Sequence, residues 1–317
     1  MKTVFNFKKL IASTAVIAAA MSVSLSAEAG LFSSAKIELA NEVSNNNYYI
    51  VTDGTPDYNS YGNLTDTGDY FREFSGVDLN GDSATTSFSA RAYSQAAYGT
   101  LKTYATAILT NPIDPSANNN PFVVDTSFTI NQNGMPTRYG ATANASFSDT
   151  LTISSSASVS SIRLQLAISG EVDSGDTRPY TAYAAVYQSG SSTNLFDANA
   201  NQIVNQNIWS NLISVVGNQA SFELALASEL IFYTWFLPEG GIYSATSDFF
   251  HTLGVSSIAG YDANGQQVNL TSAIGASGTH YTVAAPVNPG TSIPEPATLT
   301  LLGIGLAGMG WARRWRS

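Results

Sequence analysis

Apolar and polar residues alternate along several stretches in the middle of the chain. The alternation is loose over Ser87–Ile108, and it recurs in segments that begin at Ala145, Ser161 and Tyr180. The stretch Ala220–Leu237 is more continuously apolar, and its segment "SELIFYTWF" fits either a buried strand or a helix, with its aromatic content favouring the strand. Period-two alternation is typical of strands with one buried face. The pattern therefore predicts a β-rich body.

Turn signals support this prediction. Three Asn-Gly dipeptides, which favour tight hairpin turns, lie between apolar or β-branched residues: Asn80-Gly81, Asn133-Gly134 and Asn264-Gly265. The chain has 16 Tyr and 15 Phe, a content that suits antiparallel sheets with aromatic side chains inside and Ser and Thr outside. We therefore expect an all-β fold, an antiparallel β-sandwich of the jelly-roll type, with a closed barrel as the alternative.

The first 29 residues have the three parts of a secretory signal peptide. Lys2, Lys8 and Lys9 form the positive region, a short apolar run follows, and Ala27 and Ala29 supply the small-x-small pattern of a cleavage site. The apolar run is short for a helix that must cross about 30 Å of hydrocarbon. We expect export through the secretion translocon and cleavage after Ala29, with an uncleaved N-terminal anchor as the alternative.

The last residues form a second membrane signal. A Pro-Glu-Pro triplet precedes sixteen uncharged residues, 297–312, and three arginines follow; these residues are Pro294, Glu295, Pro296, Arg313, Arg314 and Arg316. As a helix the uncharged stretch would span about 24 Å, which is short but usable in a thinned bilayer. Arginines stay on the cytoplasmic side, so the triplet is expected on the outer face of the inner membrane. Its two prolines keep the backbone extended and open to an enzyme.

This tail resembles the PEP-CTERM sorting domain of Gram-negative bacteria. In that domain a Pro-Glu-Pro motif, a short transmembrane helix and an Arg-rich cluster follow one another at the C-terminus. The resemblance implies that Pro294–Pro296 are recognised by an exosortase, that 297–312 anchor the chain transiently in the inner membrane, and that the product reaches the cell surface or the medium. The resemblance also implies a link with exopolysaccharide production, which such systems accompany, and therefore a biofilm setting. An ordinary C-terminal anchor is the alternative.

These signals divide the chain into four segments. We expect a signal peptide at 1–29, a β-sandwich extracellular domain at 30–285, a Pro-rich linker with the Pro-Glu-Pro motif at 286–296, and a transmembrane helix with an Arg-rich tail at 297–317.

Charge and cysteine content narrow the possible functions. The net charge is −10, and residues 30–296 hold 22 acidic and 7 basic residues. A body of this sign repels nucleic acid, so no nucleic-acid partner is expected. The chain has no Cys, which removes thiol catalysis, thiolate metal sites and disulfides.

One cation site is suggested by spacing. Asp78, Asn80 and Asp82 alternate in "VDLNGDS", and such oxygen ligands can surround Ca²⁺. The segment departs from the EF-hand loop, because Ser83 stands where that loop has Gly and no Glu closes it. A hairpin turn with incidental acids is the alternative. A second acidic stretch is open to the same two interpretations: Asp53, Asp57, Asp66 and Asp69. No other cofactor is expected.

No motif points to catalysis. His251 and His280 have no second ligand close in sequence, and no G-x-S-x-G elbow, Walker loop or dinucleotide fingerprint occurs. Glycoside cleavage needs two carboxylates about 5–9.5 Å apart. Nothing in the sequence pairs the plausible donors, which are Glu171, Glu223, Glu229 and Glu239.

These observations predict an exported surface or matrix protein that is not an enzyme and that associates with exopolysaccharide. Two alternatives stay open. A carbohydrate-binding module would use aromatic faces on sugar rings and would show exposed aromatics on one sheet face. A secreted polysaccharide hydrolase would show two carboxylates facing each other in a groove.

Overall fold

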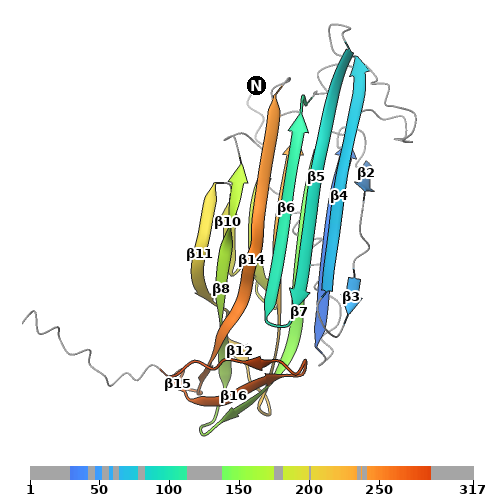
Figure 1. Ribbon diagram of the computed structural model, residues 1–317. Helices are drawn as coiled ribbons and strands as arrows, with labels where there is room; N and C mark the ends of the chain where they lie inside the picture. The colour runs from blue at the N-terminus through green and yellow to red at the C-terminus, as the bar shows by residue number, and fades with distance from the viewer. Residues whose placement is uncertain are drawn as a thin grey trace, which may run out of the picture. The chain divides into compact units, whose positions relative to one another are not determined.

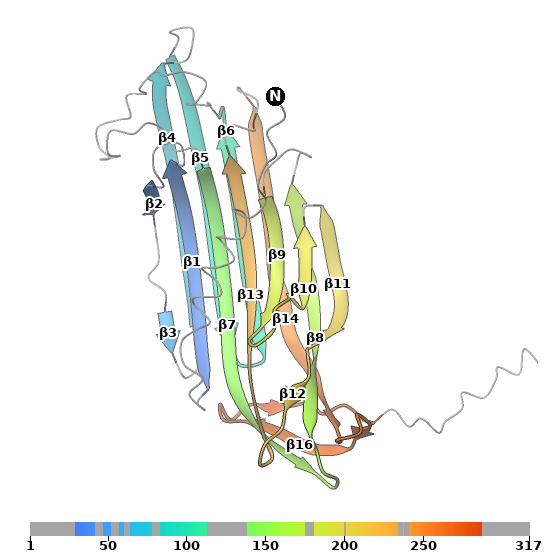
Figure 2. The same ribbon diagram turned by 180° about the vertical axis from the view of Figure 1, so that it is seen from behind.

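The computed structural model describes ten parts of the chain: residues 29–41, 47–51, 57–59, 64–77, 83–112, 138–174, 181–199, 201–233, 237 and 241–286. All regular elements in these parts are strands, and every strand pair is antiparallel except for one isolated parallel bridge between Ile258 and Val283. In the same parts, no helix that would be long and apolar enough to cross a membrane is found. The strands form two sheets (Figures 1 and 2).

Sheet A contains β1 (Gly30–Asn41), β2 (Asn47–Val51), β3 (Asp57–Asn59), β7 (Arg138–Ser155), β9 (Thr181–Gln188), β10 (Phe196–Asn199), β13 (Gln219–Tyr233), β16 (Leu270–Gly275) and β17 (His280–Tyr281). Sheet B contains β4 (Leu64–Val77), β5 (Ser83–Ala97), β6 (Thr100–Thr110), β8 (Ser161–Ser174), β11 (Gln202–Trp209), β12 (Ile213–Ser214), β14 (Ile242–Tyr261) and β15 (Gln267–Val268). The two sheets share one core of buried residues, so the body is an antiparallel β-sandwich.

Eight of these strands have the strand order of a jelly roll. In sheet B the order is β6-β14-β8-β11, and in sheet A it is β7-β13-β9-β10. Apart from the β9–β10 hairpin, each successive strand of the eight crosses to the other sheet, as in a rolled-up pair of Greek keys. The N-terminal strands widen both sheets at one side, because β1 pairs with β7 and β5 pairs with β6. The predicted jelly-roll strand order is therefore present in the described strands.

The buried strand β13 settles the ambiguity for Ala220–Tyr233, and residues 234–236 lie outside the described residues. Its fifteen residues are extended, and Leu224–Phe232 are buried on both faces of the strand. Aromatic and β-branched residues favour this state over a helix. The Asn264-Gly265 turn is also confirmed: it joins β14 to β15, and Gly265 has a φ of 76°. The other two Asn-Gly dipeptides lie outside the described residues.

The loose alternation over Ser87–Ile108 proves to be two strands. β5 and β6 are joined by Tyr98 and Gly99, and Gly99 has a φ of 81°, a backbone conformation that favours glycine. The buried residues have even numbers before this turn, as at Ala96, and odd numbers after it, as at Leu101. That switch is the sequence signal by which the hairpin could have been predicted.

The core between the sheets carries several hydroxyl groups that pair across the sandwich. Ser33 on β1 and Ser94 on β5 are fully buried, with their Oγ atoms 2.6 Å apart. The Oγ of Ser228 on β13 lies 2.8 Å from Thr103 Oγ1 and 3.0 Å from Ser247 Oγ. Buried polar groups are tolerated when they are hydrogen-bonded in this way. The expectation that Ser and Thr lie only outside is thus wrong for this part of the core.

The C-terminal end of the body is held by both sheets. β17 pairs with β16 of sheet A, while the backbone N–H groups of Ile258 and Ala284 complete a parallel bridge between β14 and the last residues. Asp149 on β7 is 1% exposed and accepts hydrogen bonds from Ser277 Oγ at 2.6 Å and Tyr281 Oη at 2.9 Å. The backbone N–H groups of Thr150 and Ser277 also donate to its Oδ1. Four donors thus compensate a buried carboxylate.

Candidate functional site

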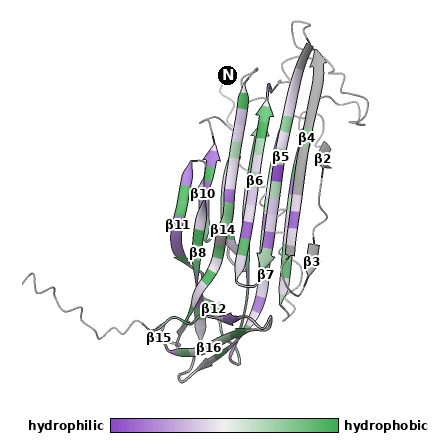
Figure 3. Ribbon diagram, in the orientation of Figure 1, coloured by the Kyte–Doolittle hydropathy of each residue, from purple (hydrophilic) through white to green (hydrophobic). Residues whose placement is uncertain are grey.

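The outer face of sheet B, which points away from the core, is the candidate site. Strand register places its side chains in rows across the strands. The hydropathy colouring of Figure 3 shows hydrophilic and hydrophobic residues mixed along β5, β6 and β14 of this sheet. One row runs from Tyr93 on β5 through Tyr104 on β6 and Asp248 on β14 to Glu171 on β8. The next row holds Arg91, Thr106, Thr246 and Asp173, and a third holds Phe71, Ser89, Ile108 and Ser244. We call six of these side chains and one neighbour the sheet B platform: Phe71, Arg91, Tyr93, Tyr104, Thr106, Ile108 and Phe250.

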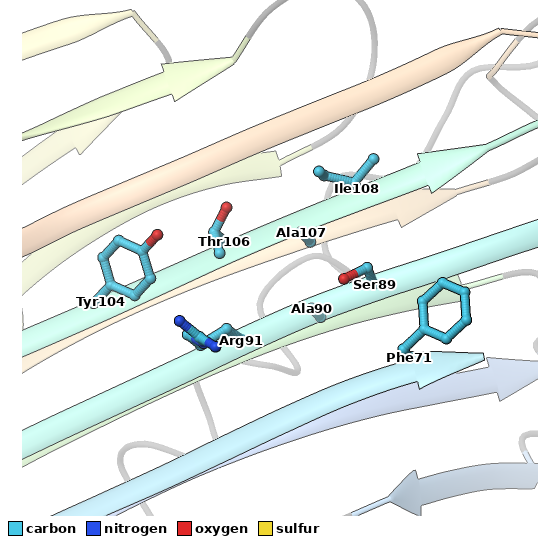
Figure 4. Close-up of a pocket in the computed structure, with 8 residues that line it drawn as sticks. All are labelled: Phe71, Ser89, Ala90, Arg91, Tyr104, Thr106, Ala107 and Ile108. Carbon is cyan, nitrogen blue, oxygen red and sulfur yellow. The ribbon is translucent and has the colours of Figure 1, made fainter.

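A shallow hollow of about 440 Å³ lies within the platform. Figure 4 shows Tyr104, Thr106 and Ile108 projecting from β6, and Arg91 from β5. The hollow exists because Ser89 is small and lies between two large apolar neighbours, Phe71 and Ile108. Phe71 is 68% exposed and Ile108 is 44% exposed. Exposed apolar side chains that gather on one face are a feature of interaction surfaces.

The aromatic end of the platform is formed where β14 bulges. The register of β14 against β6 shifts between Phe249 and Leu253, and bulges of this kind re-aim a side chain. Phe250 lies at the bulge, is 37% exposed, and its ring centroid is 4.8 Å from that of Tyr93. The ammonium group of Lys102 lies 5.1 Å from the centroid of the Phe250 ring.

Gly170 on β8 permits this bulge. A Cβ added at Gly170 would lie 2.5 Å from the backbone oxygen of Asp248 and 2.7 Å from the Phe249 ring. A larger residue would therefore displace the backbone of β14 next to Phe250.

Polar groups flank the aromatic rings. The hydroxyls of Thr106 and Thr246 lie 3.1 Å apart between β6 and β14. Asp248 stands opposite Tyr104 and accepts the backbone N–H of Phe250 at 2.9 Å. This flat face carries aromatic rings beside hydrogen-bond donors and acceptors. It suits a ligand that is apolar on one side and rich in hydroxyl groups at its rim.

The outer face of sheet A differs sharply. Its central residues on β13, Ala225, Ala227 and Glu229, are each no more than 6% exposed. Tyr183 Oη donates to Glu229 Oε2 at 2.6 Å, and Arg138 Nη2 lies 3.8 Å from Glu229 Oε1. Burial, and secondly the charge of Glu229, raise the pKa of the Tyr183 hydroxyl, which therefore stays protonated as a donor. This face offers no comparable exposed set of rings among the described residues.

The three candidate carboxylates of a hydrolase that lie in the described residues are not brought together. Glu171 lies on the outer face of sheet B, whereas Glu223 and Glu229 lie on the outer face of sheet A. Six residues of strand separate Glu223 from Glu229, which corresponds to about 20 Å. Glu239 lies outside the described residues. No two of the described three can therefore act on one glycosidic bond.

Glu223 gives a prediction of its own. Burial raises its pKa to about 7, so the folded state binds a proton that the unfolded state releases between about pH 4.5 and 7. Stability should therefore fall as the pH rises through this window. We expect Glu223→Gln to raise the free energy of unfolding at pH 8 by about 1 kcal/mol, after a discount for solvent screening, and to change it little at pH 4.5.

Urea unfolding at the two pH values measures this effect. Glu171→Gln, the same substitution at an exposed position on sheet B, is the control. Equal pH dependence in the wild type and in Glu223→Gln would contradict the prediction.

Most residues singled out from the sequence lie outside the described parts of the chain. This holds for the sorting residues Pro294–Pro296, the three terminal arginines, Ala27, and the candidate calcium ligands Asp78, Asn80 and Asp82. Ala29 immediately precedes β1. Of the second acidic stretch, Asp66 accepts the backbone N–H of Ala35 at 2.7 Å and so has a structural role between β4 and β1. Asp57 and Asp69 lie within β3 and β4, and Asp53 lies outside the described parts.

The two histidines belong to different sheets. His251 lies within β14, and His280 is exposed on β17. Across the described ranges, no three His, Asp or Glu side chains gather as a metal site.

Sequence reasoning missed the platform residues individually. Tyr93 and Tyr104 were expected inside with the other aromatics, but they point outward, while small residues such as Ala92 and Ala105 fill the core. A signal was present: Tyr93 alternates with Ala92 and Ser94 on β5, and Tyr104 alternates with Thr103 and Ala105 on β6, so the small residues beside each tyrosine could face the core.

The comparison with known protein families gives one match. The PEP-CTERM protein-sorting motif matches residues 292–314. This confirms the resemblance of the tail, and since exosortases recognise such motifs, it supports an exosortase as a partner of this chain. The chain has no match among curated proteins.

Proposed function

We propose that this protein is an exported surface or matrix protein that holds extracellular polysaccharide on its sheet B platform and catalyses no reaction. In this proposal the secretion translocon exports the chain and removes residues 1–29. The helix at 297–312 then anchors it transiently in the inner membrane. An exosortase processes the tail near Pro294–Pro296, and the body is released or attached within the biofilm polysaccharide.

The observation that carries the proposal is the exposed aromatic face of sheet B. Sugar rings present an apolar face of C–H groups and a rim of hydroxyls, and aromatic rings pack against the first while polar neighbours bind the second. Phe71 and Phe250 are exposed on this face, and Tyr104 lies between them beside Asp248. Folding alone gives no reason to place these rings in water.

The charge of the body favours a neutral polysaccharide over an acidic one. Residues 30–296 carry a large excess of acidic groups, and Glu171 and Asp173 lie on the same face as the platform. An anionic polymer would be repelled. Arg91 is the cation within the hollow and can donate to sugar hydroxyls.

One observation favours a hydrolase as the second candidate. Glu171 on β8 stands directly opposite Asp248 on β14, where Cβ atoms are about 4.5–5.5 Å apart. A retaining glycosidase needs carboxyl groups at about 5–5.5 Å. We place this candidate second because Glu171 is exposed to water, whereas the acid of such a pair is held in an apolar pocket. Release of reducing ends from polysaccharide, lost in Glu171→Gln, would favour the hydrolase.

The sorting step predicts a defined change at the C-terminus. Protein from cells with the exosortase should end at or near Pro294–Pro296, and protein from cells without it should keep residues 297–317. Mass spectrometry of both products measures this. Glu295→Ala should give the unprocessed mass even in cells with the enzyme. Identical C-termini in the two strains would contradict the sorting proposal.

Binding is tested separately, with full-length protein kept in mild detergent. We expect it to be retained on insoluble, neutral exopolysaccharide from the producing cells and to be released by the soluble form of the same polymer. Lack of retention on that polymer, together with no binding on a broad glycan array, would overturn the binding part of the proposal and leave the sorting part standing.

A further inference from the structure

Strand β11 forms an open edge of sheet B. It pairs with β8 on one side over all eight residues, Gln202–Trp209, and no described strand pairs with its other side. Every second residue of an edge strand turns its backbone N–H and C=O away from the sheet, where another strand can bind them.

This edge lacks the features that usually prevent pairing between molecules. Edge strands are commonly protected by charged residues, prolines, bulges or short length. β11 reads "QIVNQNIW" and contains no charge and no proline, and its register against β8 is continuous. The opposite edge strand of sheet B, β4, has four charged residues among its fourteen, and β10 in sheet A is only four residues long.

Two of the exposed side chains of β11 are large and apolar, and the others are amides. Ile203 is 83% exposed and Trp209 is 39% exposed, and both lie on the outer face of sheet B, opposite Glu171 and Gln165 of β8. Leu212 and Val216, just beyond the strand, are 63% and 78% exposed. Such residues at an unprotected edge indicate a surface that another chain covers.

The sequence of β11 is close to a chemical palindrome centred on Gln206. In an antiparallel pair of two β11 strands related by a two-fold axis at Gln206, Ile203 faces Trp209 of the second copy and Val204 faces Ile208. Asn205 faces Asn207, and Gln206 faces Gln206. Apolar residues thus meet apolar residues, amides meet amides, and side chains on the outer face stay on the outer face.

We propose that β11 pairs with β11 of a second copy of this chain in this register. The pairing is isologous, as expected for a closed dimer. It joins the two B sheets edge to edge, so that both sheet B platforms lie on one continuous face. The inference does not depend on polysaccharide binding, although a polymer that spans both platforms would gain from two-site attachment.

An eight-residue strand pair buries less surface than a stable dimer, for which about 1,200–2,000 Å² is typical. The proposed dimer is therefore a transient one in solution, and cross-linking is the measurement that detects it. The chain contains no cysteine, so a single introduced thiol reports one contact.

The test uses full-length Gln206→Cys in mild detergent, oxidised with copper phenanthroline. Gln206 is exposed on β11, and two directly opposed residues have Cα atoms about 4.5–5.5 Å apart, within reach of a disulfide. We expect a disulfide-linked dimer to form at least tenfold faster than in Thr152→Cys, which places an exposed thiol on β7 of sheet A. Equal rates in the two variants would overturn the proposal.

Two further variants test the register. A mixture of Asn205→Cys and Asn207→Cys should yield mainly the mixed dimer, because these two positions oppose each other. Predominant self-linked dimers of either variant would contradict the register proposed. Adding Ile203→Lys to Gln206→Cys should slow cross-linking at least tenfold, since each lysine would face Trp209 of the other copy at an exposed position that folding does not use. An unchanged rate would likewise count against the pairing.

Discussion

Replacement of Asp149 by alanine should lower the free energy of unfolding by about 3–5 kcal/mol, the largest single-residue effect we expect on stability. The carboxylate is buried and receives the hydroxyls of Ser277 and Tyr281 and two backbone N–H groups. Its removal leaves the buried hydroxyl of Tyr281 without this acceptor and leaves a cavity between β7 and β17. Burial, and secondly the charge of Asp149, raise the pKa of Tyr281, which holds the phenol as a donor.

Urea or guanidinium unfolding of the full-length protein measures this loss. Ser277→Ala removes one donor and should cost only about 1 kcal/mol. The double variant should lose less than the sum of the two single losses, because the residues share one network. A loss of under about 1 kcal/mol in Asp149→Ala would show that the network does not hold the C-terminal end of the body.

The second large effect is on polysaccharide binding. Replacing Tyr93, Tyr104 and Phe250 together by alanine should weaken binding about 100-fold or more, since each ring contributes about 1–1.5 kcal/mol and tenfold corresponds to 1.4 kcal/mol. The three rings form the aromatic end of the sheet B platform, and Tyr93 and Phe250 are in contact. Isothermal titration with a soluble fragment of the polymer measures the change.

Leu212→Ala is the matched control for this experiment. Leu212 is more exposed than any of the three rings and lies beyond β11, away from the hollow. We expect its affinity for the polymer to equal that of the wild type. Equal losses in the control and in the triple variant would mean that binding is nonspecific adhesion to apolar surface.

The fold could be predicted largely from local patterns, but the site could not. Alternation along β7 and β8 and the apolar run of β13 each indicate a strand, and β13 is buried on both faces. The pairing of these strands depends on contacts between residues far apart in sequence, such as Ala273 with Ile153. Local patterns do not encode such contacts.

The platform could not be predicted because aromatic side chains were expected inside the fold. Aromatic rings usually fill a core, and Phe88 and Phe147 are among the largest fully buried side chains of this protein. Tyr93 and Tyr104 point away from the core because alanines at neighbouring positions already fill the space between the sheets. The partners of Asp149 were also out of reach, because Ser277 and Tyr281 lie 128 and 132 residues further along the chain.

The most direct test of the proposed function is hydroxyl-radical footprinting of the full-length protein with and without the soluble polysaccharide. We expect the oxidation of Phe71, Tyr104 and Phe250 to fall when the polymer is present, while the oxidation of Leu212 does not change. Unchanged oxidation of the three rings at a polymer concentration that saturates binding, or protection confined to sheet A, would contradict it.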